Sequence, residues 1–348
     1  MSVFPLEAPV HWWNKNRKLF PWSQTQDPYK VWVSEVMLQQ TVAASVIEPY
    51  SRWMKLWPNF QALAKAEERQ VLREWEGLGY YSRARNLWRG AQILVAKGYS
   101  QLPTNWEELR LIPGIGDYTA SALLSFCSLL PLITLDSNLK RVFQRLAAKK
   151  DWDKFDAEKW LSKFQVLWRE VPITSRETNL ALMQFGQQVC KPKSPSCSVC
   201  PLTEVCEAFK QGLQGSIPQP KVFVKEVLNT QIRISSDATG LWFCRSLKGR
   251  FSQLWRFPGV PQTDEPPTIG GPWMQLKNHI HYYTRYQENL EVWGCYGPDL
   301  DSNLCPVNKD GEEYKIFSWS DALNIPMPSV YRRIFKEWLS TVKTGLDC

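Results

Sequence analysis

The sequence predicts an all-α part over residues 1–211, a linker over residues 212–221 and a smaller α+β domain over residues 222–348. Three observations support this fold class. Apolar residues recur at helical spacing from about residue 5 to residue 210. The stretch Gly212–Pro220 (GLQGSIPQP) has the composition of a linker, and short segments rich in β-branched and aromatic residues follow it. A chain of 348 residues is long enough for two or three domains with separate cores.

The expected elements follow in order along the chain. Helical spacing, with Gly and Pro between the segments, predicts helices in Tyr29–Val46, Val71–Trp75, Ala84–Val95, Thr119–Leu129 and Asn138–Leu146. Strand composition bounded by turn residues predicts strands in Val227–Ile234, Gly240–Arg245 and Asn289–Tyr296. A last helix is expected over Pro328–Val342.

Composition narrows the function classes. Hydrophobic residues make up 44%, charged residues 22% and aromatic residues 13%, which excludes a disordered, collagen-like or coiled-coil chain. The net charge of +8 is uneven, because residues 1–215 hold 27 basic and 20 acidic side chains, whereas residues 216–348 hold 15 and 14. A basic face on the first part would suit a polyanion.

The sequence also bears on the compartment. It has no run of about 18 apolar residues, so we expect no membrane span. The first residues, MSVFPLEAPVHWW, lack the basic region, long apolar stretch and cleavage site of a secretory signal. We therefore expect a cytoplasmic protein, associated with the nucleoid in a bacterium, or nuclear or organellar in a eukaryote.

Four of the nine cysteines form the strongest motif, with the spacing C-x6-C-x2-C-x5-C: Cys190, Cys197, Cys200 and Cys206. Clustered cysteines in a cytosolic chain favour a metal or cluster over disulfides. Zinc sites usually pair their ligands as two short knuckles, and only Cys197 and Cys200 form such a pair. The uneven spacing therefore favours a [4Fe–4S] cluster, with zinc as the alternative.

A glycine-rich turn precedes a helical run at Leu111–Ala120 (LIPGIGDYTA). Gly114 and Gly116 let the backbone approach a ligand closely, and the amides that follow can hold a phosphate oxygen. The alternative is an ordinary corner between two helices.

Two carboxylates are candidates for acid–base chemistry. Glu35 lies between apolar neighbours, and a carboxyl group in apolar surroundings has the raised pKa of a general acid. Asp136 follows an apolar run and precedes a helix, so it is either a second functional carboxylate or an N-cap. A glutamate on the surface of an amphipathic helix is the alternative for Glu35. Cleavage of a glycosidic bond needs two carboxylates in different environments.

A fourth segment, GLGYYSRARNL, combines aromatic and basic side chains. Tyr80 and Tyr81 stand beside Arg83 and Arg85, which suits base stacking and phosphate contact. Aromatic core packing with a solvated basic face is the alternative.

Together these motifs resemble one family. The segments SEVMLQQT, GLGYYSRARNL, IPGIGDYTA and LDSN, the pattern N-x-A-x-M-x-x-G that begins at Asn179, and the four-cysteine loop are similar to the adenine DNA glycosylases of the MutY family. This family belongs to the helix-hairpin-helix superfamily, which also contains endonuclease III. The resemblance is dense over residues 10–210 and loose over residues 220–340. It implies a helix-hairpin-helix glycosylase part with a [4Fe–4S] cluster loop, followed by a Nudix-like domain.

The resemblance implies roles for the catalytic candidates. Glu35 matches the general acid that protonates adenine at N7. Asp136 matches the carboxylate that stabilises or captures the deoxyribose cation, and Asn138 and Tyr118 match its polar supporters. Bifunctional relatives carry a nucleophilic lysine where this chain has Tyr118, which cannot form a Schiff base, so base removal without strand cleavage is expected.

The resemblance also implies DNA and metal contacts. Leu38, Gln40 and Tyr80 match residues that enter the base stack where adenine is extruded, and Thr41 matches a position near the opposite lesion base. The four cysteines match the cluster ligands.

Some positions depart from the family pattern. Ser23 and Leu180 stand where the family often has longer polar residues near the adenine, and Ser137 replaces the glycine of Asp-Gly-Asn. These departures place the adenine contacts in question.

The C-terminal part carries the family's lesion-reading segment in altered form. Leu254–Gly259 (LWRFPG) fits the Nudix-like signature, and Val260–Gly271 contains no glutamate-rich hydrolase box. The Phe-Ser-His of the family appears as Tyr283, Thr284 and Arg285.

The sequence therefore predicts a monomeric, monofunctional glycosylase that removes adenine opposite 8-oxoguanine or guanine in double-stranded DNA. One alternative is a related glycosylase for thymine or uracil opposite guanine. Another is a catalytically silent DNA-binding protein, which the presence of both Glu35 and Asp136 disfavours.

Overall fold

The structure is a computed structural model that describes residues 4–219, 224–249, 251–262, 267, 273–283, 285–297 and 311–346. The chain divides into two compact units. Residues 1–66 and 86–221 form the N-terminal unit, and residues 67–85 and 222–348 form the C-terminal unit. The prediction of an all-α part followed by an α+β part is confirmed.

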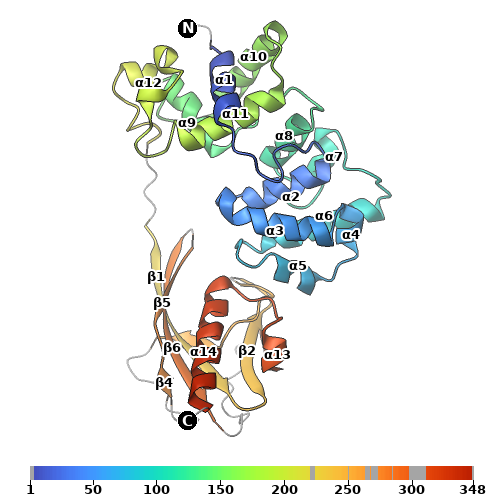
Figure 1. The fold of residues 1–348 in the computed structure, drawn as a ribbon, viewed down its shortest axis with the longest axis vertical. Coiled ribbons are helices and arrows are strands. Elements are labelled where there is room, and N and C mark those ends of the chain that lie inside the picture. The colour runs from blue at the N-terminus through green and yellow to red at the C-terminus, as the bar shows by residue number, and fades with distance from the viewer. Residues whose placement is uncertain are drawn as a thin grey trace. The chain divides into compact units, whose positions relative to one another are not determined.

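Helices build the N-terminal unit (Figure 1). Its α-helices are α1 (Glu7–Asn16), α2 (Pro28–Leu38), α3 (Ala43–Leu56), α4 (Phe60–Ala64), most of α6 (Ser82–Ala96), α7 (Trp106–Arg110), α8 (Asp117–Phe126), α9 (Ser137–Leu146), α10 (Lys154–Glu170), α11 (Ser175–Gln188) and α12 (Glu207–Lys210). Two 3-10 turns, η1 (Cys197–Val199) and η2 (Thr203–Val205), lie between α11 and α12. Among the described helices, none combines the length and hydropathy needed to cross a bilayer.

The segment Tyr29–Val46 is not one helix, which corrects the sequence prediction. Asp27 caps α2 by accepting hydrogen bonds from the backbone N–H groups of Tyr29 and Lys30, and Pro28 occupies the first turn. The helix ends at Leu38, and Gln40 has a φ of 55°, which no helix can continue. Apolar spacing runs across this break, so periodicity alone did not reveal it.

The glycine-rich turn joins α7 to α8. Gly114 has a φ of +83°, and a Cβ there would lie 2.8 Å from the Cβ of Asn86. Gly116 is the N-cap of α8, and its carbonyl accepts from the Ala120 N–H at 2.9 Å. Helix α8 ends at Phe126, three residues before the predicted end.

The C-terminal unit is a mixed sheet with helices. Its elements are α5 (Glu68–Glu74), β1 (Glu226–Ser236), β2 (Gly240–Ser246), β3 (Gly259–Pro261), β4 (Met274–Gln275), β5 (His279–Tyr282), β6 (Tyr286–Tyr296), β7 (Glu312–Ser318), α13 (Trp319–Ala322) and α14 (Ser329–Leu346). The described strands follow the order β4-β6-β1-β2-β7, with β3 paired to β1 and β5 paired to β6. Strands β1 and β6 are parallel, and the other pairs are antiparallel.

Helix α14 packs its apolar face on the sheet (Figure 1). Ile334, Phe335 and Trp338 are buried with apolar side chains of β1, β2 and β6. Gly294 of β6 permits this packing, because a Cβ there would lie 2.4 Å from the Trp338 ring. The LWRFPG segment supplies three more buried residues, since Leu254, Trp255 and Phe257 are at most 5% exposed.

Candidate active site and cysteine loop

Glu35 is buried on α2, with 6% of its surface exposed. The Tyr118 hydroxyl donates to its Oε2 at 2.8 Å. Burial raises the pKa of Glu35 from 4.5 to about 7, while the Tyr118 hydrogen bond lowers it and the charge of Asp136 raises it. A carboxyl group with this pKa holds a transferable proton near neutral pH. The alternative of a surface glutamate is therefore wrong.

Asp136 combines the two roles that the sequence left open. It is the N-cap of α9, where its Oδ1 accepts from the Leu139 N–H at 2.7 Å. Its Oδ2 accepts from the Asn138 Nδ2 at 2.7 Å. Burial raises the pKa of Asp136, and these two donors lower it because they favour the anion.

The structure brings the four predicted catalytic residues into one cluster. The negative charge of Asp136 raises the pKa values of both Glu35 and Tyr118, after the larger effect of burial. Gly186 of α11 allows this arrangement, because a Cβ there would lie 2.8 Å from the Cβ of Asn138. Two carboxyl groups with different donors thus stand near each other.

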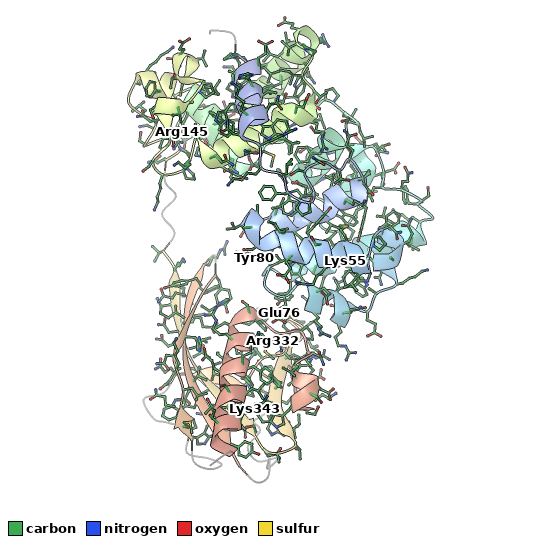
Figure 2. The ribbon with its side chains drawn as sticks, viewed as in Figure 1. Lys55, Glu76, Tyr80, Arg145, Arg332 and Lys343 are labelled. Atoms are coloured by element: carbon green, nitrogen blue, oxygen red, sulfur yellow. The ribbon has the colours of Figure 1, made fainter. Side chains whose placement is uncertain are left out.

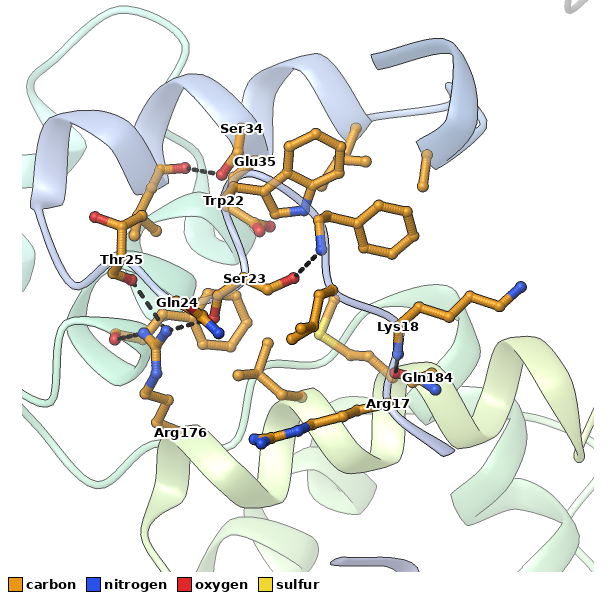
Figure 3. A pocket seen from close by; sticks show the side chains of 18 of the residues that line it. Arg17, Lys18, Trp22, Ser23, Gln24, Thr25, Ser34, Glu35, Arg176 and Gln184 are labelled. Atoms are coloured by element: carbon orange, nitrogen blue, oxygen red, sulfur yellow. Dashed lines mark hydrogen bonds between the residues drawn. The ribbon is translucent and has the colours of Figure 1, made fainter. Parts of the chain in front are cut away.

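Glu35 lies in the wall of a pocket of about 140 Å³ (Figure 3). Ser23, Leu38 and Leu180 line the same pocket. Ser23 and Leu180 are the positions where the sequence departs from the family pattern near the base, so those departures fall beside the candidate acid. The Trp22 ring is stacked on Phe20 at 5.1 Å between centroids.

Arg176 also lines this pocket, and the sequence did not predict it as a site residue. Its guanidinium reaches from α11 to the loop before α2, donating to the carbonyl oxygens of Ser23 at 2.9 Å and Thr25 at 3.0 Å (Figure 3). It also donates to the Phe126 carbonyl. An arginine that follows a helix N-cap gave no sign of this long-range contact, because the loop lies about 150 positions earlier in the chain.

The remaining candidates from the N-terminal unit lie around the break after α2 and the glycine turn. Gln40 has its positive φ at this break, and the Thr41 N–H donates to the Leu38 carbonyl at 3.2 Å. Gly114, Gly116 and Tyr118 line a second pocket of about 950 Å³. The glycine turn thus lines this second pocket.

Tyr80 lies in the C-terminal unit, with 48% of its surface exposed. Arg83 is 9% exposed and donates to the carbonyls of Leu78 and Gly79 at 2.8 and 3.1 Å. Arg85 donates to Glu68 at 2.8 Å and to the Ser252 carbonyl. The alternative of a solvated basic face therefore does not hold for Arg83 and Arg85, which both bond to other groups of the protein.

The four cysteines lie between α11 and α12, each partly buried and without a disulfide. The pKa of Cys200 is raised to about 12, mainly by burial, and the charges of the other three cysteines contribute to this rise, so the four thiols lie near one another. The Cys200 sulfur accepts from the Leu202 N–H at 3.4 Å. Among the described residues, no three His, Cys, Asp or Glu side chains are arranged to hold a single metal ion.

Two arginines of α9 bind the cysteine loop. Arg145, 2% exposed, donates to the Cys190 sulfur at 3.3 Å and to the carbonyls of Lys191 and Pro192 at 2.7 and 3.0 Å. Arg141 donates to the Cys190 carbonyl at 2.9 Å and to the Asn138 Oδ1 at 3.0 Å. Helix α9 therefore carries the candidate aspartate at one end and the loop contacts along its length. The spacing of two arginines four residues apart was the available signal.

Of the lesion-reading candidates, Tyr283 directly follows β5 and Arg285 directly precedes β6. The Tyr283 hydroxyl donates to Glu288 at 2.8 Å. Arg285 is exposed, and its carbonyl accepts from the Glu226 N–H at 2.9 Å. Thr284 lies outside the described residues.

Comparison with known proteins agrees with this geometry. Residues 33–170 match a family described as HhH-GPD superfamily base excision DNA repair protein. An adenine DNA glycosylase of Buchnera aphidicola subsp. Baizongia pistaciae is 37% identical over 206 residues, which cover 58% of this chain and 57% of that protein. An adenine DNA glycosylase of Mus musculus is 36% identical over 293 residues, which cover 77% of this chain and 56% of that protein. The chain thus spans a little over half the length of these curated relatives.

Solved structures share the fold of the helical part. A thermostable thymine-DNA glycosylase superposes with a TM-score of 0.54 at 23% identity, covering 59% of this chain and 95% of its own. A trapped endonuclease III–DNA covalent intermediate gives a TM-score of 0.51 at 23% identity, covering 60% and 95%.

Proposed function

We propose that the chain, which matches the HhH-GPD superfamily of base excision DNA repair proteins over residues 33–170, is a member of that superfamily and a monofunctional adenine DNA glycosylase. Its substrate is adenine mispaired with 8-oxoguanine or guanine in double-stranded DNA. The observation that carries the proposal is the buried Glu35, with a pKa of about 7, beside the hydrogen-bonded Asp136.

These two carboxyl groups suit the two halves of base release. Glu35 donates its proton to N7 of the extruded adenine, so that the base leaves as a neutral group when the bond between N9 and C1′ breaks. Asp136 remains an anion because Asn138 and the Leu139 N–H donate to it, and it stabilises the positive charge that develops on the sugar. Water then adds at C1′, which leaves an abasic site.

Tyr118 restricts the reaction to base removal. Its hydroxyl donates to Glu35 at 2.8 Å, and burial raises its pKa. A phenol supplies no amine for a Schiff base, so β-elimination of the strand does not follow base removal.

The cysteine loop fits a [4Fe–4S] cluster held by Cys190, Cys197, Cys200 and Cys206. The four thiols gather between α11 and α12, and N–H groups of Arg145 and Leu202 point at two of the sulfurs. Such donors stabilise the charge on cluster thiolates. When bound, the cluster would fix the loop that Arg141 and Arg145 join to α9. Iron and sulfide analysis of anaerobically purified protein tests this assignment, and stoichiometric zinc without iron would contradict it.

The C-terminal unit supplies the choice of opposite base. Tyr283, Thr284 and Arg285 stand for the lesion-reading segment of the family, with Thr284 able to donate to and accept from the edge that 8-oxoguanine changes. Thr284→Ala should reduce the preference for 8-oxoguanine over guanine, whereas Arg285→Ala should weaken binding to both mispairs alike. Loss of the preference in Arg285→Ala alone would reverse these two roles.

One experiment separates the candidate activities. The protein is incubated in single-turnover conditions with duplexes that carry adenine opposite 8-oxoguanine, adenine opposite guanine, and thymine or uracil opposite guanine. Release from the adenine mispairs alone supports the proposal. Release of thymine or uracil would replace it with the related glycosylase, and binding without any release would leave a silent DNA-binding protein.

A further inference from the structure

The exposed Tyr80 stands on a turn that we call the Tyr80 turn, residues 75–81. It packs with residues 222–348 in the C-terminal unit, although the two segments are far apart in the sequence. The family resemblance implies DNA stacking by Tyr80, and the proposed function assigns base choice to the C-terminal unit. Hydrogen bonds and an ion pair join the Tyr80 turn to residues 222–348.

The Tyr80 turn has an unusual backbone. Tyr80 has a φ of 45°, and Gly77 and Gly79, which both precede it, also have positive φ values. Bonds inside the turn support it, because the Trp75 Nε1 donates to the Gly79 carbonyl at 2.9 Å and Arg83 donates to the same carbonyl. A non-glycine residue with this backbone conformation depends on its surroundings to hold it there.

Three contacts tie the Tyr80 turn and the start of α6 to the C-terminal part, and Figure 2 labels the two residues of the first, Glu76 and Arg332. Glu76 forms a two-bond ion pair with Arg332 of α14, at 2.8 and 3.1 Å. The Tyr81 hydroxyl donates to the carbonyl of the fully buried Met327 at 2.9 Å. Arg85 donates to the Ser252 carbonyl. The anchored positions lie on both sides of Tyr80.

Arg332 is itself held in place, so it can serve as a fixed support. Its guanidinium also donates to the Ala322 carbonyl at 3.0 Å and to the Ile325 carbonyl. Its side chain is 11% exposed and that of Glu76 is 24% exposed, so solvent screens the pair only partly.

From these contacts we infer that the C-terminal domain positions Tyr80 for entry into the base stack, with Glu76 and Arg332 as positioning residues. The inference rests on the proposed function and on the DNA contact that the family resemblance implies for Tyr80. A side chain that is already ordered loses less conformational entropy on binding. The C-terminal domain, which reads the opposite base, thus also orders the stacking residue Tyr80 before DNA binds.

A double-mutant cycle tests this coupling. Affinity is measured by fluorescence anisotropy for a duplex with adenine opposite 8-oxoguanine, in which a 2′-fluorine on the adenosine prevents base release. Glu76→Gln should weaken binding about fivefold in the wild-type background and less than about twofold when Tyr80 is already alanine. Exchanging the charges, with Glu76→Arg and Arg332→Glu together, should restore part of the loss. A 2-aminopurine beside the mispair should report less unstacking with Glu76→Gln.

The controls separate positioning from general damage. Glu67→Gln removes the same charge from an exposed position of the same unit, where the side chain is 78% exposed, and should leave affinity within about twofold. Equal losses from Glu76→Gln with and without Tyr80, or full wild-type unstacking by Glu76→Gln, would overturn the inference. Failure of the proposed function is distinct, because the wild type would then bind the mispair duplex no more tightly than a fully paired one.

Discussion

Glu35 of the N-terminal unit and two carboxylates of the C-terminal unit show opposite ways of holding a carboxyl group away from water. In the N-terminal unit, Glu35 is bound by the neutral hydroxyl of Tyr118, and no described cation pairs with it. In the C-terminal unit, two partly buried carboxylates are paired with arginines, Glu76 with Arg332 and Glu312 with Arg256. A buried carboxyl group with neither a cation nor N–H donors keeps its proton, whereas one paired with an arginine stays ionised and holds segments together. The difference separates a group suited to chemistry from groups suited to structure.

The largest expected effect tests the chemical side of this comparison. Glu35→Gln keeps the size of the side chain and removes the transferable proton. Adenine release in single-turnover assays should fall by about 10²- to 10⁴-fold, the range of general acid catalysis. Glu48→Gln, on the exposed face of α3, is the matched control and should release adenine at the wild-type rate. Near-normal release by Glu35→Gln would remove Glu35 from the mechanism.

Glu35→Gln should lower the rate of adenine release but raise the stability of the protein at pH 8. Because the folded pKa of Glu35 is about 7 against 4.5 in the unfolded chain, the wild type loses stability as pH rises from 4.5 through 7. Glu35→Gln has no such loss and should be more stable than the wild type at pH 8, by up to about 3 kcal/mol relative to the difference at pH 4. Urea denaturation at both pH values measures this. A mutant that is less stable than the wild type at pH 8 would contradict the account of burial.

A smaller effect is expected on the structural side. Glu312→Gln leaves Arg256 and the Tyr314 hydroxyl without a charged partner in a pair whose side chains are both 16% exposed. The C-terminal unit should lose about 2 kcal/mol of unfolding free energy, between the values of exposed and buried pairs. Glu313→Gln on the same strand breaks the more exposed pair with Arg245 and should cost less than about 1 kcal/mol. Equal losses of unfolding free energy from the two variants would show that the strength of these ion pairs does not depend on their burial.

The smallest effect comes from a charge pair at the surface. Glu48 and Arg52 lie four residues apart on α3 at 2.7 Å, with side chains 83% and 43% exposed. Glu48→Gln should change the unfolding free energy by less than about 0.5 kcal/mol, and added salt should abolish even that. A loss above about 1 kcal/mol would mean that short distance, and not burial, sets the strength of these pairs.

The sequence predicted Glu35, Asp136, Asn138 and Tyr118 as one group, and the structure places them together. That success came from long motifs whose residues lie close in the chain or resemble a known family. The same sequence reasoning left Asp136 as either cap or functional carboxylate, because one side chain can accept from a helix N–H and still face a site.

Other features depend on contacts that no local pattern encodes. Arg83 and Arg85 were predicted to contact phosphate, with a solvated basic face as the alternative, and in the structure their partners lie in their own turn, on α5 and at Ser252. Arg176 binds carbonyls of a loop far earlier in the chain. The helical conformation is interrupted at Gln40 by a positive φ, although the apolar pattern of the sequence continues across this position. In each case tertiary packing overrides the local signal.

The pH dependence of adenine release tests the central claim most directly. The claim is that burial without a counter-ion makes Glu35 a proton donor at neutral pH. Single-turnover rates with subsaturating protein, between pH 5 and pH 9, should be level at low pH and fall about tenfold per pH unit above about 7. Tyr118→Phe removes a hydrogen bond that lowers the pKa of Glu35, so it should move this fall to higher pH. A rate that stays constant from pH 6 to pH 9 in the wild type would contradict the account.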